Sequence, residues 1–170
     1  FAGGCFWGVE HYFKQVRGVV ETQAGYANGN RACPDYEEVC TGRTGFAETV
    51  RVTFDATQVD LVLLLQLYFK AIDPTSLNWQ GGDAGSQYRT GIFFTDPQDE
   101  ATARQALDEL AKQYADPIVV ELLPLKNFYA AEDYHQDYLD KHPDGYCHLR
   151  PELFQWAAQA NALQAEENEA

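Results

Sequence analysis

The residue with the clearest chemical potential is Cys5, which follows Gly3-Gly4 and precedes Phe6-Trp7. Apolar residues then recur at helical spacing, at Phe6, Val9, Phe13 and Val16. Cys5 is therefore predicted to lie at a helix N-terminus. Unpaired backbone N–H groups and the positive end of the helix dipole gather there, and both favour a thiolate over a thiol. The alternative is a buried core cysteine, but a core position does not need paired glycines before it. We therefore predict a reactive thiol.

A carboxylic acid, Glu48, is the second candidate. Residues 46–54 alternate strictly in sequence, which predicts a strand with Phe46, Glu48, Val50, Val52 and Phe54 on one face. Burial among these apolar neighbours would raise the pKa of Glu48 and let it donate a proton at neutral pH. A solvated carboxylate, or a salt bridge with Arg51 or Arg89, is an equally open interpretation.

The loop of residues 81–89 contains three glycines, so its backbone can approach a ligand closely. Asp83 within it is either a ligand contact or a turn residue. Four cysteines are present and none forms a CxxC pair: Cys5, Cys33, Cys40 and Cys147. That spacing supports neither a structural zinc site nor a thioredoxin-type motif. Four cysteines are also too sparse for a disulfide framework at this length, so catalytic or redox use in a reducing compartment is predicted.

The elements that must position these residues follow from hydrophobic periodicity. A first helix is predicted over residues 5–16, and the others over 36–40, 61–71, 97–114 and 131–141. Further strands are predicted over 19–26, 88–94 and 118–122. With one more strand before Gly3, the order is βαββαβ followed by an extra αβ pair.

This order predicts an α+β fold, a two-layer α/β plait. It has a ferredoxin-like βαββαβ core, additional αβ elements and a long coiled C-terminal segment. Residues 1–150 are predicted to form the functional domain, and residues 151–170 to form a docking helix or linker.

Composition excludes some partners. The 170 residues include 12 Lys and Arg against 26 Asp and Glu, a net charge of −14. We expect no nucleic-acid partner, because phosphate contacts need clustered cations. No apolar run approaches membrane-spanning length and no signal peptide is visible. A cytoplasmic protein without membrane association is therefore expected, although the chain does not begin with Met and an upstream targeting segment stays open.

Five motifs carry a resemblance, in the order GGCFWGVE, GYANGN, PDYEEVCTGRTGFAE, GGDAGSQYRTG and FYAAEDYHQDYL with the following HPDGYCH. Together they resemble peptide methionine sulfoxide reductase A, from Gly3 to about His148. GYANGN and the segment DPTSLN are also similar to members fused to a reductase B domain.

The resemblance implies a role for each matching residue. Cys5 matches the nucleophile, and Glu48 matches the acid that protonates the sulfoxide oxygen. Tyr36 and Tyr88 match two phenols that hydrogen-bond this oxygen, and Asp83 matches a carboxylate in the same site. A sulfoxide oxygen leaves poorly until it is protonated, so an acid and two O–H donors suit thiolate attack.

The resemblance also implies the fate of the sulfur atoms. Phe6 and Trp7 match the rings that hold the substrate methyl group, in keeping with favourable sulfur–aromatic contacts. After reduction of methionine-S-sulfoxide, free or in proteins, Cys5 is left as sulfenic acid. Cys147 matches the resolving cysteine, which forms a disulfide with Cys5 that thioredoxin reduces. A monomer that needs no cofactor and no metal is implied.

Some residues depart from the family pattern. Phe46 stands where His is common, and Ala84 where His or Thr is common, so both remove polar side chains near the predicted site. Cys33 is expected to be an exposed loop thiol, and Cys40 a buried structural thiol.

Two rival functions follow from the residues alone. A metal site could use Glu132, His135, His142 and His148, with the first two three apart on a predicted helix. A carboxylate di-metal site needs that pair twice, and the chain has it once. The other rival is a non-enzymatic binding plait. Such a module would not explain why Cys5 lies at a helix terminus and a second cysteine, Cys147, lies near the end of the chain.

Overall fold

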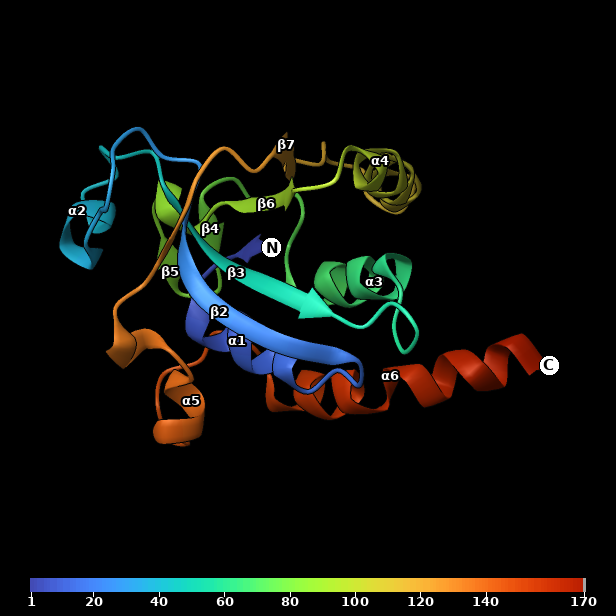
Figure 1. Ribbon diagram of the computed structural model, residues 1–170. Coiled ribbons are helices and arrows are strands. Elements are labelled where there is room, and N and C mark those ends of the chain that lie inside the picture. Colours follow the sequence, from blue (N-terminus) through green and yellow to red (C-terminus); the bar gives the residue numbers. More distant parts are fainter. Residues whose placement is uncertain (170) are drawn as a thin grey trace.

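The computed structural model describes residues 1–169 (Figure 1). The strands are β1 (Ala2–Gly3), β2 (Val19–Ala27), β3 (Ala47–Phe54), β4 (Trp79–Gln80), β5 (Asp83–Ala84), β6 (Thr90–Phe94), β7 (Glu121–Pro124) and β8 (Phe128–Ala130). The helices are α1 (Phe6–Lys14), α2 (Tyr36–Cys40), α3 (Leu61–Ala71), α4 (Pro97–Ala111), α5 (Tyr138–Lys141) and α6 (Pro151–Glu169). Two 3₁₀ turns complete the set, η1 (Ser86–Tyr88) and η2 (Asp133–His135).

Two three-stranded sheets, with strand orders β1-β6-β7 and β3-β2-β8, together have the topology of the predicted plait. β1 pairs antiparallel with β6, and β2 pairs antiparallel with both β3 and β8. Phe1 and Val50 exchange two backbone hydrogen bonds of 2.9 Å, which join β1 to β3 in the antiparallel pattern. The inner strand order β6-β1-β3-β2 is that of a βαββαβ plait. β7, parallel to β6, and β8 extend the two edges. The predicted α+β fold is confirmed.

The C-terminal helix α6 lies against α1 and α3 (Figure 1). Ala157 and Ala160 are buried there, and the Lys70 ammonium lies 4.3 Å from the centroid of the Trp156 ring. Asn161 donates hydrogen bonds to the backbone carbonyls of Arg17 and Gln58. These contacts agree with a docking helix, and the domain boundary at residue 150 stays a prediction.

The segment of residues 131–141 is not the continuous helix that was predicted. It forms η2 and α5, which are separated at Asp137, a non-glycine residue in the left-handed region with φ 52°. Gln136 uses its side chain to bond both the N–H and the carbonyl of Ala24 on β2. These long-range bonds hold the segment extended at that point, and helical periodicity alone does not reveal them.

Two further predictions need correction. The strand predicted over residues 118–122 is β7 in the structure, and it begins three residues later, at Glu121. The short hairpin β4–β5 and the edge strand β8 were not predicted, because runs of two or three residues carry no periodicity to read.

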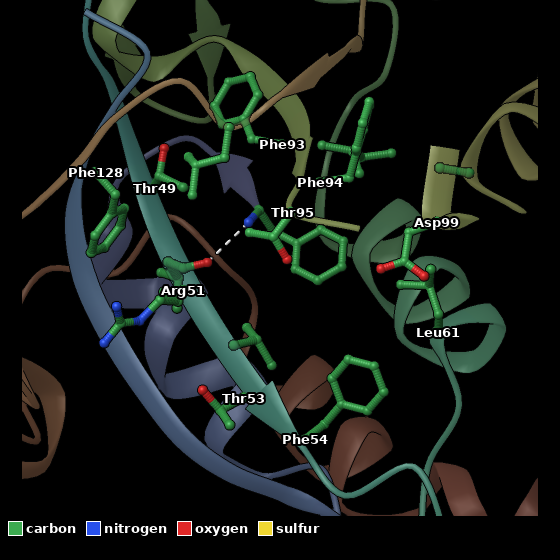
Figure 2. A pocket seen from close by; sticks show the side chains of 16 residues that line it. Thr49, Arg51, Thr53, Phe54, Leu61, Phe93, Phe94, Thr95, Asp99 and Phe128 are labelled. Atoms are coloured by element: carbon green, nitrogen blue, oxygen red, sulfur yellow. Dashed lines mark hydrogen bonds between the residues drawn. The ribbon is translucent and has the colours of Figure 1, made fainter. Parts of the chain in front are cut away.

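A pocket of about 380 Å³ opens between β3 and β6 (Figure 2). Thr49, Arg51 and Thr53 line it from β3, and Phe93 and Phe94 line it from β6. None of the catalytic or substrate-binding residues predicted from the sequence is among the residues that line this pocket. The site of interest therefore lies elsewhere, where β1 ends and α1 begins.

Candidate active site

Cys5 is the N-cap residue of α1, as the sequence predicted, and its side chain is 7% exposed. Burial raises the pKa of the thiol, and the neighbouring carboxyl of Glu48 raises it further. The backbone N–H of Trp7 acts in the opposite direction and does not outweigh them. The helix terminus alone therefore does not make Cys5 a thiolate here, contrary to the expectation from its position.

Glu48 lies in the first half of β3 and is 2% exposed. Its Oε1 atom accepts a hydrogen bond of 3.1 Å from the backbone N–H of Phe6, the residue after Cys5. Burial raises the pKa of Glu48 to about 8, against the lowering effect of that hydrogen bond, and the charge of Asp83 adds to the rise. Glu48 is therefore a protonated acid at neutral pH, held beside the cysteine.

The alternative interpretations of Glu48 are wrong. Arg89 pairs with Glu121, and the guanidinium of Arg51 lies over the ring of Phe128. Neither arginine neutralises Glu48.

The predicted alternation of buried and exposed residues also fails in the first half of β3, because Ala47 and Thr49 on the other face are buried as well.

Two phenols, Tyr36 and Tyr88, lie near Glu48 and Cys5. Tyr36 is the first residue of α2, and Tyr88 is the last residue of η1. Burial raises the pKa of both hydroxyls, and the charges of Glu48 and Cys5 contribute to each rise. Both phenols therefore stay protonated at neutral pH and can donate hydrogen bonds.

Asp83 and Cys147 complete the cluster. Asp83, on β5, accepts a hydrogen bond of 2.8 Å from the hydroxyl of Tyr146. Cys147 packs against α1, since a Cβ built on Gly8 would lie 3.0 Å from its sulfur. The charges of Asp83 and Cys147 both act on the pKa of Cys5. The structure thus brings together all six ionisable residues that the sequence singled out.

The two aromatic residues after Cys5 differ in exposure. Phe6 is buried against the rings of Tyr26 and His135, whereas Trp7 is only partly buried. Trp7 stacks on Tyr138 with ring centroids 3.7 Å apart, and its indole N–H donates to His135. Trp7 therefore presents the more accessible ring of the pair.

Glu132 is a residue of this site that sequence reasoning considered only as a metal ligand. Its carboxylate accepts hydrogen bonds from the Tyr26 hydroxyl at 2.9 Å and from the Tyr36 backbone N–H at 3.2 Å. Burial acts to raise the pKa of Glu132. Hydrogen bonds from its own backbone N–H, the Tyr26 hydroxyl and the Tyr36 N–H outweigh this effect, and the pKa is lowered. Glu132 therefore holds the start of α2, and with it Tyr36, as an ionised anchor.

Replacing Glu132 by Ala is expected to lower kcat about 10-fold, because the carboxylate that accepts the Tyr36 backbone N–H is lost and Tyr36 is held less firmly. The alkylation rate of Cys5 should not change, because Glu132 does not contact the thiol. Steady-state kinetics and iodoacetamide labelling test both points. Glu37→Ala is the control, because Glu37 is an exposed acid next to Tyr36 in α2. This variant should retain the parental kcat. An unchanged kcat in Glu132→Ala would contradict the anchor role.

The metal-site residues are used differently in the structure. Glu132 accepts hydrogen bonds from three tyrosines and His135 accepts one from Trp7, while the predicted helix that would align them is broken. Among the side chains that the structure describes, which leave out those of residues 167, 168 and 170, His, Cys, Asp and Glu form no group of three that could hold a metal ion. Within residues 1–169, no helix combines the length and apolar character needed to cross a bilayer.

Comparison with known proteins decides the family. The sequence model for the family described as peptide methionine sulfoxide reductase matches residues 1–167. The chain belongs to the peptide methionine sulfoxide reductase family. It is 54% identical over 153 residues to peptide methionine sulfoxide reductase MsrA of Clostridium acetobutylicum, covering 90% of this chain and 94% of that protein.

Solved structures agree with this family. The reduced form of Mxr1 from Saccharomyces cerevisiae superimposes with a TM-score of 0.83 at 38% identity, covering 88% of this chain and 89% of that one. The complex of Mxr1 with Trx2 gives a TM-score of 0.58 at 25% identity, covering 87% and 83%. As a reductase of the A type, the chain is an enzyme, a peptide-methionine (S)-S-oxide reductase, so the non-enzymatic binding plait is wrong.

The structure shows the burial of the residues that depart from the pattern of this reductase family. Phe46 is 1% exposed and covers Gly29, where a Cβ would lie 2.2 Å from its ring. Ala84 is exposed on β5. Cys33 is exposed, as expected, but Cys40 at the end of α2 is exposed too, which corrects the prediction of a buried structural thiol.

Proposed function

We propose that this reductase converts methionine-S-sulfoxide, free or in proteins, to methionine by way of a sulfenic acid on Cys5. The observation that carries the proposal is the bond from Phe6 N–H to Glu48. It joins a buried acid with a pKa of about 8 to the residue that follows the cysteine. A protonated acid beside a thiol suits cleavage of a sulfur–oxygen bond, because the oxygen leaves only after protonation.

In the proposed first step, the sulfur of Cys5 attacks the sulfoxide sulfur and forms an S–S bond. The oxygen then migrates to the Cys5 sulfur as this S–S bond and the substrate S–O bond break. The oxygen ends on Cys5 as sulfenic acid, and methionine leaves as the reduced product. Glu48 gives its proton to the oxygen, and the thiol proton of Cys5 returns to Glu48. No proton is gained or lost overall, so the buried acid is reset. Tyr36 and Tyr88 supply O–H donors to the oxygen as negative charge develops on it.

The substrate is held by the groups around the cysteine. The uncovered face of Trp7 suits a soft S-methyl group, with Phe6 as the buried ring of the pair. Asp83 adds a carboxylate whose charge favours the protonated form of Glu48. The acid therefore keeps its proton until the sulfoxide oxygen arrives.

In the second step, Cys147 attacks the sulfenic acid, forms the Cys5–Cys147 disulfide and releases water. Its position against Gly8, one turn along α1 from Cys5, supports this role. An external dithiol then reduces the disulfide by exchange and is itself oxidised. The solved complex of yeast Mxr1 with Trx2 supports thioredoxin as that dithiol.

Replacing Cys147 by Ser tests the resolving step. The variant is expected to produce one methionine per enzyme in a single turnover, because Cys5 and Glu48 remain in place. Turnover with thioredoxin should fall by at least about 10-fold, since no Cys5–Cys147 disulfide can form. Methionine formation is followed on the separated S epimer, with a thiol count before and after one turnover.

Cys33→Ser is the matched control, because this exposed thiol lies in a loop away from α1. It should turn over with thioredoxin at the parental rate. A parental rate in the Cys147 variant would contradict its assignment as resolving residue. Absence of any methionine from the unmodified protein would contradict the proposed function itself.

A further inference from the structure

His135 lies among the aromatic side chains of the site and is 1% exposed. Its ring centroid is 5.0 Å from that of Phe6, 5.7 Å from Trp7 and 4.7 Å from Tyr36. Tyr134 covers it from the other side at 4.1 Å. One buried imidazole therefore contacts the rings proposed for the methyl group and a phenol proposed for the oxygen.

A hydrogen bond of 2.9 Å runs from the indole N–H of Trp7 to Nδ1 of His135. An indole nitrogen only donates, so Nδ1 must be the acceptor and the imidazole proton must be on Nε2. Burial lowers the pKa of His135, against the opposite effect of Glu132, and this favours the neutral ring that the bond requires. The residues that form the bond are 128 positions apart in sequence.

The other ring nitrogen of His135 gives a second, independent observation. Nε2 is buried, and within residues 1–169 it has no hydrogen-bond partner. A buried donor without a hydrogen-bond partner lowers the stability of the fold. A purely apolar side chain at this position would avoid that loss, so folding stability alone does not explain the histidine.

Trp7 is held at a second point by Tyr138, whose ring stacks on it at an interplanar angle of 11°. One face of the indole is thus covered and its N–H edge is anchored. The tilt of the ring is then fixed, and only the opposite face is left for a ligand. Misplacement of a reacting group by about 1 Å can lower a rate by about 100-fold.

We propose that His135 is a positioning residue: its Nδ1 atom fixes the tilt of Trp7 and so sets where the substrate methyl group sits relative to Cys5. The proposal rests on the proposed assignment of Trp7 to the methyl group. His135 does not touch the reacting atoms. It acts on the fit of the substrate through Trp7.

Two amide substitutions separate the acceptor from the rest of the side chain. Asn at position 135 places its carbonyl near the position of Nδ1, whereas Gln extends toward the position of Nε2. His135→Gln is expected to lower kcat/KM for methionine-S-sulfoxide by about 10-fold, mainly through KM. His135→Asn should retain most of the parental value. The Trp7 indole ¹H–¹⁵N resonance, assigned with Trp7→Phe, should move in the Gln variant and stay near its parental position in the Asn variant.

His11→Asn is the control, because the His11 ring packs edge-on against Phe154 and pairs with Asp140 rather than with Trp7 or Tyr138. Its kinetics and indole resonance should match the parent. If the Gln variant does not fold, Tyr138→Leu removes the other contact of Trp7 and should raise KM in the same way.

Three results would overturn the proposal. The first is an unmoved indole resonance together with parental kinetics in His135→Gln. If Tyr138→Leu is measured in its place, parental kinetics in that variant have the same meaning. The second is an equal loss in the Asn and Gln variants at parental thermal stability. The third is a displaced resonance without any change in KM. Inactivity of the parent protein would instead refute the proposed function, while the resonance would still report on the bond.

Discussion

Replacing Glu48 by Gln is expected to slow methionine sulfoxide reduction by about 10²- to 10⁴-fold, the usual contribution of a positioned general acid. Gln keeps the shape of the side chain and can still accept the Phe6 N–H, but it cannot release a proton to the oxygen. Single-turnover formation of methionine measures the reduction step without the later disulfide chemistry. Glu100→Gln, an exposed acid in α4, is the control and should keep the parental rate. A parental rate in Glu48→Gln would show that another group protonates the oxygen.

The same substitution should change the pH dependence. The reduction rate of the parent should fall as pH rises through about 8, where Glu48 loses its proton, and this step should be absent in Glu48→Gln. The folded-state pKa lies above the ordinary value of 4.5. The stability contributed by the protonated form is therefore fully present below pH 4.5 and is lost as pH rises through about 8. At pH 9 the Gln variant should consequently unfold at a higher temperature than the parent. Calorimetry at pH 5 and 9 tests this, and equal unfolding temperatures at pH 9 would contradict the buried, raised-pKa acid.

Cys5→Ser is expected to abolish reduction completely, even in a single turnover. A hydroxyl is a far weaker nucleophile than a thiol and has no reversible counterpart of the sulfenic acid. Methionine formation from the S epimer, at enzyme concentrations above that of substrate, gives the most sensitive measurement.

Cys33→Ser serves as the control, because this thiol is exposed in a loop and should not be needed for the first step. Circular dichroism should show both variants folded, since serine differs from cysteine by one atom. Any methionine formed above background by Cys5→Ser would remove Cys5 from its proposed role.

Some elements could be predicted from sequence because local interactions determine them. α3 begins and ends where predicted, and its start is fixed by the side chain of Asp60, which accepts a hydrogen bond from the N–H of Leu63. α2 is the single turn that was predicted, and Asp35 and Glu38 form a capping box at its start. α1 spans Phe6–Lys14, one residue shorter at its start and two at its end than the predicted helix of residues 5–16.

Other features depended on contacts between distant residues. The break at Asp137 follows the bonds between Gln136 and Ala24, which join positions 112 residues apart. The anchor role of Glu132 depends on Tyr26 and Tyr36, far away in sequence. A periodic pattern contains no information about such partners, and this segment was accordingly predicted as one helix.

The sequence by itself determined which chemical groups this reductase carries, the order of its main elements and the place of Cys5 at a helix start. Only the tertiary structure decided the protonation of those groups. Glu48 keeps its proton because β3 and its neighbours exclude water from it, and Cys5 stays a thiol because burial outweighs the helix terminus. The physical reason is that caps and periodicity act over a few residues, whereas desolvation and the bond between Trp7 and His135 arise only when the whole chain has packed.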